Sequence, residues 1–293
     1  MTGRVERRID PMSGIPVSTP ASLDDSVGLF GPESVTWRVH ADPLLIVGGL
    51  RALLLQALHP LALAGVAEHS GFRADPWGRL GRTAEFVGVL SYGTRSEAVK
   101  AAARVRGAHR GLTGVEPETG TPYRVDDPAL LLWVHCCEVE SFLTTARRGG
   151  ADLSDADADA YLREQGLAAE LIGVPREDVP ADRADLAEYF TDMKPLLRAT
   201  AESRRAARFL LAPPMPAWVQ VLTPARPAWG GLATLAFGLL PGWARKMYRL
   251  PGLGTTDAAA TASVRALRAS LERLPRQWRE GPARKAARER LAG

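Results

Sequence analysis

Cysteine is scarce in this 293-residue sequence: the chain has only two, Cys136 and Cys137, and they are neighbours. Adjacent residues on a helix point in different directions, so this pair cannot close an ordinary disulfide. The segment 1–19 carries arginines but no apolar stretch behind them, which is not the pattern of a signal peptide. These two observations make a cytoplasmic location the expectation.

The common signatures of nucleotide, zinc and hydrolase sites are also missing. The sequence has no Gly-rich phosphate loop, no Walker motif, no Cys-x-x-Cys pair and no nucleophile elbow. Its net charge of +4 comes from arginines that are scattered along the chain and concentrated near the C-terminus. No basic stripe is interleaved with aromatic residues, so we expect no nucleic-acid partner.

Long uninterrupted hydrophobic runs are absent as well. The apolar stretch 44–67 is broken by Arg51, Gln56, His59 and Pro60, and the stretch 228–240 is too short to span a bilayer. Both stretches are expected to be buried or interfacial helices.

No stretch alternates apolar and polar residues in the manner of a strand, so the predicted fold class is all-α. Helix starts are marked by Asp42-Pro43, Asp75-Pro76 and Asp127-Pro128, and Thr94 to Glu97 is close to a capping box. We predict a flexible N-terminal arm over 1–26, one helical domain over 27–280 and a basic, disordered C-terminal tail over 281–293. A globin-like arrangement of the core is one possibility within this class.

His109 is the first candidate site residue. A helix over 95–111 places it on one face with Ala102, Val105 and Arg106. These small and apolar neighbours would let a flat cofactor lie close to the helix. A polar ring on such a face must be satisfied either by a neighbouring side chain or by a bound iron, and the sequence leaves both open.

His135 lies within an apolar helix over 128–148, on one stripe with Glu138. Carboxylate-bridged di-iron bundles use the Glu-x-x-His motif twice with two further Glu, whereas one reversed copy is present here. The spacing therefore favours a buried hydrogen bond between His135 and Glu138 that tunes a nearby site. His59, directly before Pro60, is predicted to cap a broken helix in the core or in a pocket, and His40 is expected in a loop.

Arg79, Arg82 and Thr83 share one face of the helix predicted over 76–91, together with Phe86. Two arginines at this spacing fit a solvated face. The threonine and the phenylalanine fit a polar cavity at least as well.

The order and spacing of five segments resemble the catalytic domain shared by latex-clearing rubber oxygenases and the membrane-bound fungal oxygenase of mycophenolic acid biosynthesis. The segments are 51–60, 71–83, 91–93, 106–109 and 127–135. The resemblance covers roughly residues 30–250, with its specific motifs between 48 and 141. It implies a helical protein that holds a single haem b, iron protoporphyrin IX.

The resemblance also implies roles for the candidate residues. His109 would be the proximal iron ligand, Arg106 would support it or a haem propionate, and Arg79, Arg82 and Thr83 would lie on the distal side. We expect the remaining cofactor contacts to come from His59, His135, Ala102 and Val105. Rubber oxygenases are expected to carry a lysine where Arg82 stands, and because arginine stays protonated it would donate hydrogen bonds rather than ligate iron.

The expected function is therefore a haem-dependent oxygenase that inserts dioxygen across a double bond of an apolar small molecule, such as an isoprenoid, a lipid or a secondary-metabolite intermediate. One alternative keeps the haem but has peroxidase-like or non-redox chemistry. Another is a metal-free helical binder of a hydrophobic ligand at a membrane surface. The apolar stretch between Trp229 and Trp243 favours this second alternative because tryptophans at both ends are typical of peripheral membrane contact.

Overall fold

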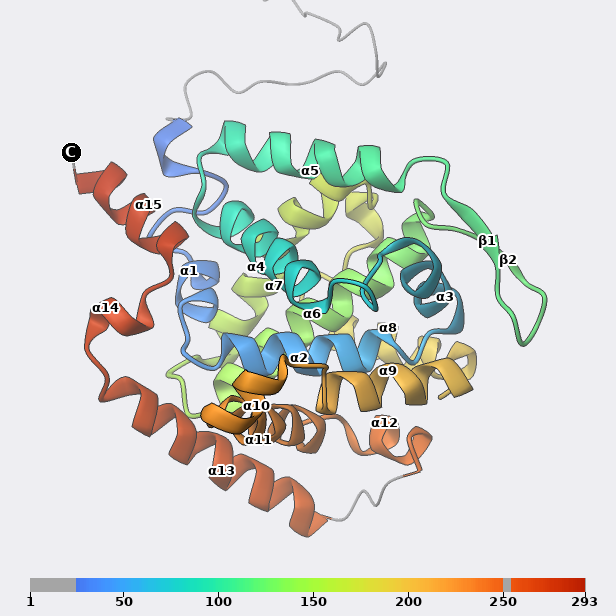
Figure 1. The fold of residues 1–293 in the computed structure, drawn as a ribbon. Helices are drawn as coiled ribbons and strands as arrows, with labels where there is room; N and C mark the ends of the chain where they lie inside the picture. Colours follow the sequence, from blue (N-terminus) through green and yellow to red (C-terminus); the bar gives the residue numbers. More distant parts are fainter. Residues whose placement is uncertain (1–24, 250–253, 293) are drawn as a thin grey trace, which may run out of the picture.

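The computed structural model describes residues 25–249 and 254–292, and within them the chain is almost entirely helical, which confirms the predicted class (Figure 1). The elements in the first half are η1 (Asp25–Val27), α1 (Val35–His40), α2 (Leu45–Gln56), α3 (Pro60–His69), α4 (Pro76–Tyr92), α5 (Arg95–His109), β1 (Thr113–Val115), β2 (Pro122–Arg124) and α6 (Pro128–Arg148). Those in the second half are α7 (Asp155–Ile172), η2 (Arg176–Asp178), α8 (Arg183–Met193), η3 (Lys194–Leu196), α9 (Ala201–Leu211), α10 (Ala217–Leu222), α11 (Ala225–Gly238), α12 (Gly242–Met247), α13 (Gly254–Glu272), α14 (Arg276–Arg279) and α15 (Pro282–Ala292).

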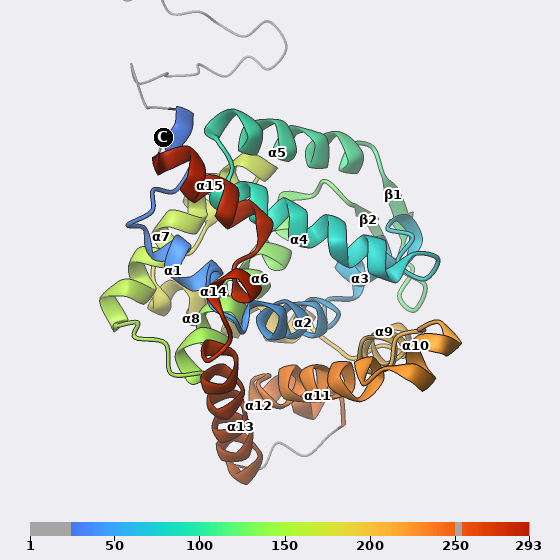
Figure 2. The ribbon, with the colours of Figure 1, turned by 60° about the vertical axis from the view of Figure 1, so that its left-hand side comes forward.

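The core is built on α2 and α6, which pack against each other along their lengths. On one side of this pair lie α1, α4, α5 and α7, and on the other lie α9, α11, α12 and α13 (Figures 1 and 2). Gly48 lets the two central helices approach closely, because a Cβ there would lie 2.9 Å from a ring carbon of Phe142. The apolar character of α2 on nearly all sides follows from this central position.

The predicted helix starts are confirmed where a side chain caps the first turn. Asp75 accepts a hydrogen bond from the Gly78 N–H, Asp127 accepts one from the Ala129 N–H, and Thr94 forms the full capping box with Glu97. The third Asp-Pro signal, at Asp42, differs slightly: its carboxylate accepts from the Leu44 N–H and the helix begins at Leu45.

The bend between α2 and α3 occurs at the predicted position, and the two helix axes differ by 109°. By length and composition α6 could cross a membrane, and so could α2 with α3 if this bent pair were one span. In the structure 72% of the most apolar window of α6 is buried inside the protein, as in the core helix of a globular domain.

Two predictions about local structure are wrong. Residues 113–124 form a short antiparallel hairpin in which Gly114 pairs with Tyr123, a contact too brief to leave a pattern in the sequence.

The segment predicted as a disordered tail forms α15, which packs on α4 with Ala287 fully buried. Arg290 also donates to the Ser26 carbonyl, so this helix joins the first described residues to the domain. Most of the predicted N-terminal arm, 1–24, lies outside the described residues.

The helix α13 does not continue into the residues that follow it. It ends at Glu272, and Pro275 precedes the separate short helix α14. Proline lacks the N–H that a continuous helix would need at this position, so the chain restarts there.

Three arginines hold the turn after α11 against the central helices. Arg51, which is 1% exposed, bonds both carboxylate oxygens of Glu140, and its Nε donates to the Leu239 carbonyl at 2.9 Å. Arg245, equally buried, donates to the Gly238 and Leu240 carbonyls at 2.7 Å and pairs with Asp257. The Arg148 side chain adds hydrogen bonds to the Asp257 carbonyl and to Thr261.

We predict that Arg51→Met lowers the free energy of unfolding by about 3 kcal/mol or more, because it removes the buried cation that pairs with Glu140. The Leu239 carbonyl would keep only its longer bond, from Arg148. Denaturant unfolding followed by circular dichroism measures this loss. The matched control is Arg205→Met, which breaks an exposed pair with Glu202 and should cost less than about 1 kcal/mol. Equal losses in the two variants would contradict the central role of Arg51.

We also predict opposite effects for two neighbouring glycines of α2. Gly48→Ala should destabilise the protein by about 1–3 kcal/mol, because the added Cβ collides with Phe142. Gly49→Ala should be neutral or stabilise by up to about 1 kcal/mol, since its Cβ would lie at an ordinary 3.9 Å from the same ring and alanine favours helix. Thermal and denaturant unfolding of the two variants give the comparison; the same sign for both would be inconsistent with the packing of α2 on α6.

Candidate functional site

His109 is the last residue of α5, the helix that lies beside α4 (Figures 1 and 2). Its ring is half-buried and forms no hydrogen bond with any residue that the structure describes. Burial and then the positive charge of Arg79 lower the pKa of His109, while Asp126 acts in the opposite direction. At neutral pH the imidazole is therefore uncharged and has a free nitrogen lone pair, which is the form that binds a metal.

Arg79 lies on α4 and is half-buried. Its guanidinium donates to the Thr83 hydroxyl, and that hydroxyl donates back to the Arg79 carbonyl at 2.9 Å. Within the described chain no carboxylate pairs with it; burial and the charge of Arg82 lower the pKa of Arg79, which nevertheless stays protonated. Arg79 and Thr83 thus present an oriented cation without a counter-ion, close to His109.

Arg82 does not join this pair. Its side chain is 59% exposed and pairs with Asp75 at 3.1 Å, which holds it at the start of α4. The pKa of Asp75 is lowered mainly by the hydrogen bond from the Gly78 N–H and, to a smaller extent, by the hydrogen bond from Arg82. The predicted common face of α4 is therefore split: Arg79 and Thr83 turn inwards and Arg82 faces solvent.

Other predicted contacts on α5 are directed elsewhere. Arg106 is exposed and donates to the Leu171 carbonyl at the end of α7, on a different side of α5 from α4. Ala102 is fully buried, so protein atoms already cover the surface that was predicted to face a cofactor. Val105 is half-buried and remains the only predicted small neighbour of His109 with free surface.

His135 is buried on α6, and burial, with a smaller effect of Arg176, lowers its pKa to about 4. The predicted hydrogen bond to Glu138 is absent. Burial raises the pKa of Glu138 to about 7, and neither side chain has a hydrogen-bond partner among the residues described. The i, i+3 spacing places the two groups on one face of the helix, but it does not bring their polar atoms together.

His59 caps α3, as predicted: its Nδ1 accepts from the Ala62 N–H at 3.4 Å, and its ring lies 5.9 Å from the ring of Trp133. Burial is the main cause that lowers the pKa of His59, with Arg198 contributing in the same direction. His59, His109 and His135 therefore have different neighbours. The structure brings together only His109, Arg79 and Thr83 from the predicted set.

Over residues 25–249 and 254–292, no three His, Cys, Asp or Glu side chains gather in a group that could hold a metal ion. A haem iron has a different requirement, because the porphyrin supplies four ligands and the protein needs to supply only one. A single accessible histidine such as His109 meets this requirement.

Sequence analysis missed a buried polar chain at His40, which lies in α1 rather than in a loop. Its two ring nitrogens lie 2.5 Å from the Ser91 hydroxyl and 2.9 Å from the Tyr161 hydroxyl. Ser91 in turn donates to the Val87 carbonyl at 2.6 Å, and burial lowers the pKa of His40 to about 3. The chain ties α1, α4 and α7 together; the only sequence signal was that Ser91 belongs to a segment of the family resemblance.

The tryptophans that favoured membrane contact are packed against protein. Trp229 donates to the Leu210 carbonyl and stacks edge-on with Trp77, while Trp243 lies 6.4 Å from the Phe190 ring. They hold α11 and α12 in place, but both are only half-buried, so peripheral membrane contact stays a prediction.

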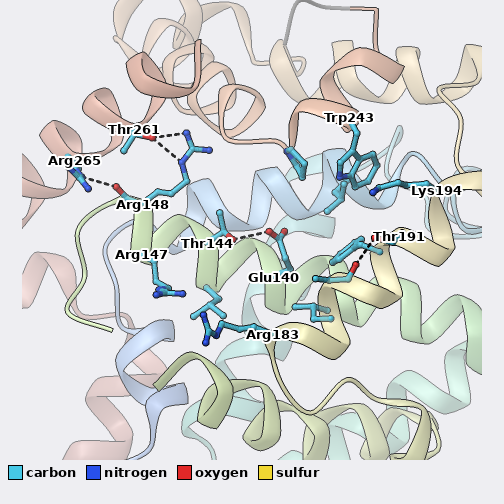
Figure 3. Close-up of a pocket in the computed structure, with 16 residues that line it drawn as sticks. Glu140, Thr144, Arg147, Arg148, Arg183, Thr191, Lys194, Trp243, Thr261 and Arg265 are labelled. Carbon is cyan, nitrogen blue, oxygen red and sulfur yellow. Dashed lines mark hydrogen bonds between the residues drawn. The ribbon is translucent and has the colours of Figure 1, made fainter. Parts of the chain in front are cut away.

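A pocket of about 760 Å³ lies between α6, α8, α12 and α13, and none of the predicted site residues lines it (Figure 3). Its residues come from five distant segments of the chain, so no local pattern could reveal it.

Comparison with curated proteins and with solved structures found no match. A family model described as the catalytic domain of the ER-bound oxygenase mpaB/B'/rubber oxygenase matches residues 37–273. The matched region begins in α1, extends through α13 and includes all the candidate residues. The chain therefore belongs to this family of oxygenase catalytic domains.

Proposed function

We propose that this protein is a haem b-dependent oxygenase that uses dioxygen to oxidise an apolar small molecule, with His109 as the iron ligand. Family membership supports the oxygenase activity. The observation that carries the haem proposal is the uncharged ring of His109, unbonded within the described residues. It lies within the electrostatic influence of the half-buried Arg79, which pairs with no carboxylate among those residues. The group of Arg79, Thr83 and His109 is called the α4–α5 site below.

The residues of the α4–α5 site fit a haem on chemical grounds. A neutral imidazole with no internal hydrogen bond keeps its lone pair for iron, and burial favours that neutral form. The uncompensated positive charge of Arg79 suits a negatively charged partner, such as a propionate or the charge that develops on reacting oxygen.

Haem, when bound, would supply the iron centre that activates dioxygen. The protein's own contribution is electrostatic. Arg79 donates hydrogen bonds to negative charge beside it, and Thr83 holds the guanidinium in one orientation before any reaction begins. Such preorganised donors stabilise charge more than water does, because they need not reorient during the reaction.

The proposed substrate is an apolar molecule such as an isoprenoid, a lipid or a secondary-metabolite intermediate. The family description names rubber, a hydrocarbon polymer, as the substrate of one branch. Half-buried Leu80 and Phe86 on α4 and Val105 on α5 would supply apolar contacts near the site. Arg82 has a lesser role in this proposal than the sequence implied, because Asp75 neutralises it at the surface.

We predict that protein purified from cells supplied with a haem precursor is red and has a Soret band, and that His109→Ala retains less than about a tenth of the haem because it removes the iron ligand. His135→Ala should retain haem, with a changed spectrum at most, since that ring is buried on another helix. Circular dichroism verifies that both variants are folded. If only His135→Ala loses haem, His109 is not the iron ligand. A colourless protein that takes up no added haem would favour a metal-free binder.

We further predict that Arg79→Leu weakens azide binding to the ferric protein about 10-fold, because the anion loses a nearby buried cation. Arg82→Leu is the matched control and should change azide affinity by less than about two-fold, since its charge is exposed and already paired. Spectrophotometric titration measures both, and dioxygen consumption with squalene as the isoprenoid probe should fall in parallel. A larger effect of Arg82→Leu would place Arg82, and not Arg79, at the iron.

A further inference from the structure

The pocket between α6, α8, α12 and α13 is separate from the α4–α5 site. On α6 it is lined by Glu140 and Thr144, which lie five and nine residues after His135. At 3.6 residues per turn these spacings correspond to rotations of about 140° and 180°. The pocket therefore lies on the opposite face of α6 from His135, and its volume of about 760 Å³ is within the range of small-molecule sites.

The lining is rich in basic groups: it contains five basic side chains and a single carboxylate. Carboxylates outside the lining pair with three of the basic residues, Asp155 with Arg147 and Arg183, Asp159 with Arg183, and Asp257 with Arg148. The basic residues are Arg147, Arg148, Arg183, Lys194 and Arg265. The carboxylate, Glu140, is already bonded through both oxygens to the buried Arg51, so it does not neutralise the pocket.

The cations are not distributed evenly. Figure 3 shows the four arginines gathered towards one end of the pocket and Lys194 at the other, beside Trp243. Arg265 bonds only to the Arg148 carbonyl through its Nε, which leaves the end of its guanidinium free of any carboxylate within the described chain. Burial lowers the pKa of Arg148. The charge of Asp257 raises this pKa, whereas the charges of Arg51 and Arg245 lower it further. Arg265 is thus the lining arginine that can bind an added anion without displacing a carboxylate of the described chain.

Apart from three threonines, Thr144, Thr191 and Thr261, the rest of the wall is apolar. The side chains are those of Leu55, Leu143, Leu186, Phe190, Pro241 and Trp243. Two of them, Phe190 and Trp243, lie with their ring centroids 6.4 Å apart, and Trp243 is at the Lys194 end (Figure 3). A surface that joins a cluster of guanidinium groups to aromatic and aliphatic side chains suits a ligand with an anionic head and a hydrocarbon tail.

We propose that this pocket binds an amphipathic carboxylate, with its head at the Arg147, Arg148, Arg183 and Arg265 end and its chain along Phe190 and Trp243. Planar guanidinium groups match the geometry of a carboxylate, which can accept two hydrogen bonds from one arginine. Binding here does not depend on haem, because no residue of the α4–α5 site lines the pocket.

Isothermal titration calorimetry of the full-length protein with decanoate tests the proposal. Two partial probes accompany it: 1-decanol has the hydrocarbon tail without the charge, and inorganic phosphate has negative charge without the tail. We expect one decanoate per protein and much weaker binding of either partial probe. The double variant Arg147→Met/Arg265→Met should weaken decanoate binding about 10-fold, since it removes two cations that lie at the pocket mouth. Lys246→Met/Arg273→Met is the matched control, because it removes the same charge outside the pocket.

Four outcomes would overturn the assignment. If 1-decanol binds as tightly as decanoate, the arginines do not recognise a negatively charged head. If phosphate binds as tightly as decanoate, the apolar wall does not bind a hydrocarbon tail. A loss in Lys194→Met, with none in the double variant, would reverse the orientation of the ligand. A loss in His109→Ala, with none in the double variant, would show that decanoate occupies the α4–α5 site. If the purified protein is colourless but decanoate still binds to the pocket, this inference stands and only the haem proposal is contradicted.

Discussion

The buried ion pair between Arg51 and Glu140 is the interaction on which the rest of this structure depends. It joins α2 to α6 at the centre of the fold, and the same guanidinium holds the Leu239 carbonyl at the turn after α11. Burying a charged group is costly unless it is paired, and here each of the three guanidinium nitrogens donates to a carboxylate, a serine hydroxyl or a carbonyl. The helices on both sides of the α2–α6 pair are arranged around this contact.

The central helix α6 separates two chemically different regions. One face carries the buried His135 and the half-buried Glu138, neither of which has a hydrogen-bond partner in the described chain. The opposite face carries Glu140 and Thr144 and forms one wall of the cationic pocket. The α4–α5 site lies outside both, between two helices that pack at the edge of the core. The fold can therefore hold a reactive centre and a second ligand without a shared side chain.

The α4–α5 site illustrates how a family pattern and a local geometry complement each other. The family match covers residues 37–273 and identifies an oxygenase domain, but it does not say which side chains point inwards. The geometry separates Arg79, which is half-buried and pairs with no acid in the part of the chain that the structure describes, from Arg82, which is exposed and paired. Polar groups that remain uncompensated in a folded protein are frequently those that act on a ligand, and Arg79 is such a group.

The sequence by itself determined the helical class, the starts of α4, α5 and α6, the break at His59 and the membership of the family. These features depend on contacts within three or four residues, such as the caps at Asp75, Thr94 and Asp127, so the local sequence contains the necessary information. Only the tertiary structure decided that Arg106 bonds to α7, that His135 and Glu138 remain apart, that α15 packs on α4 and that a cationic pocket exists. Those outcomes depend on contacts between residues far apart in the chain, and helical periodicity specifies a face of a helix but not what that face meets.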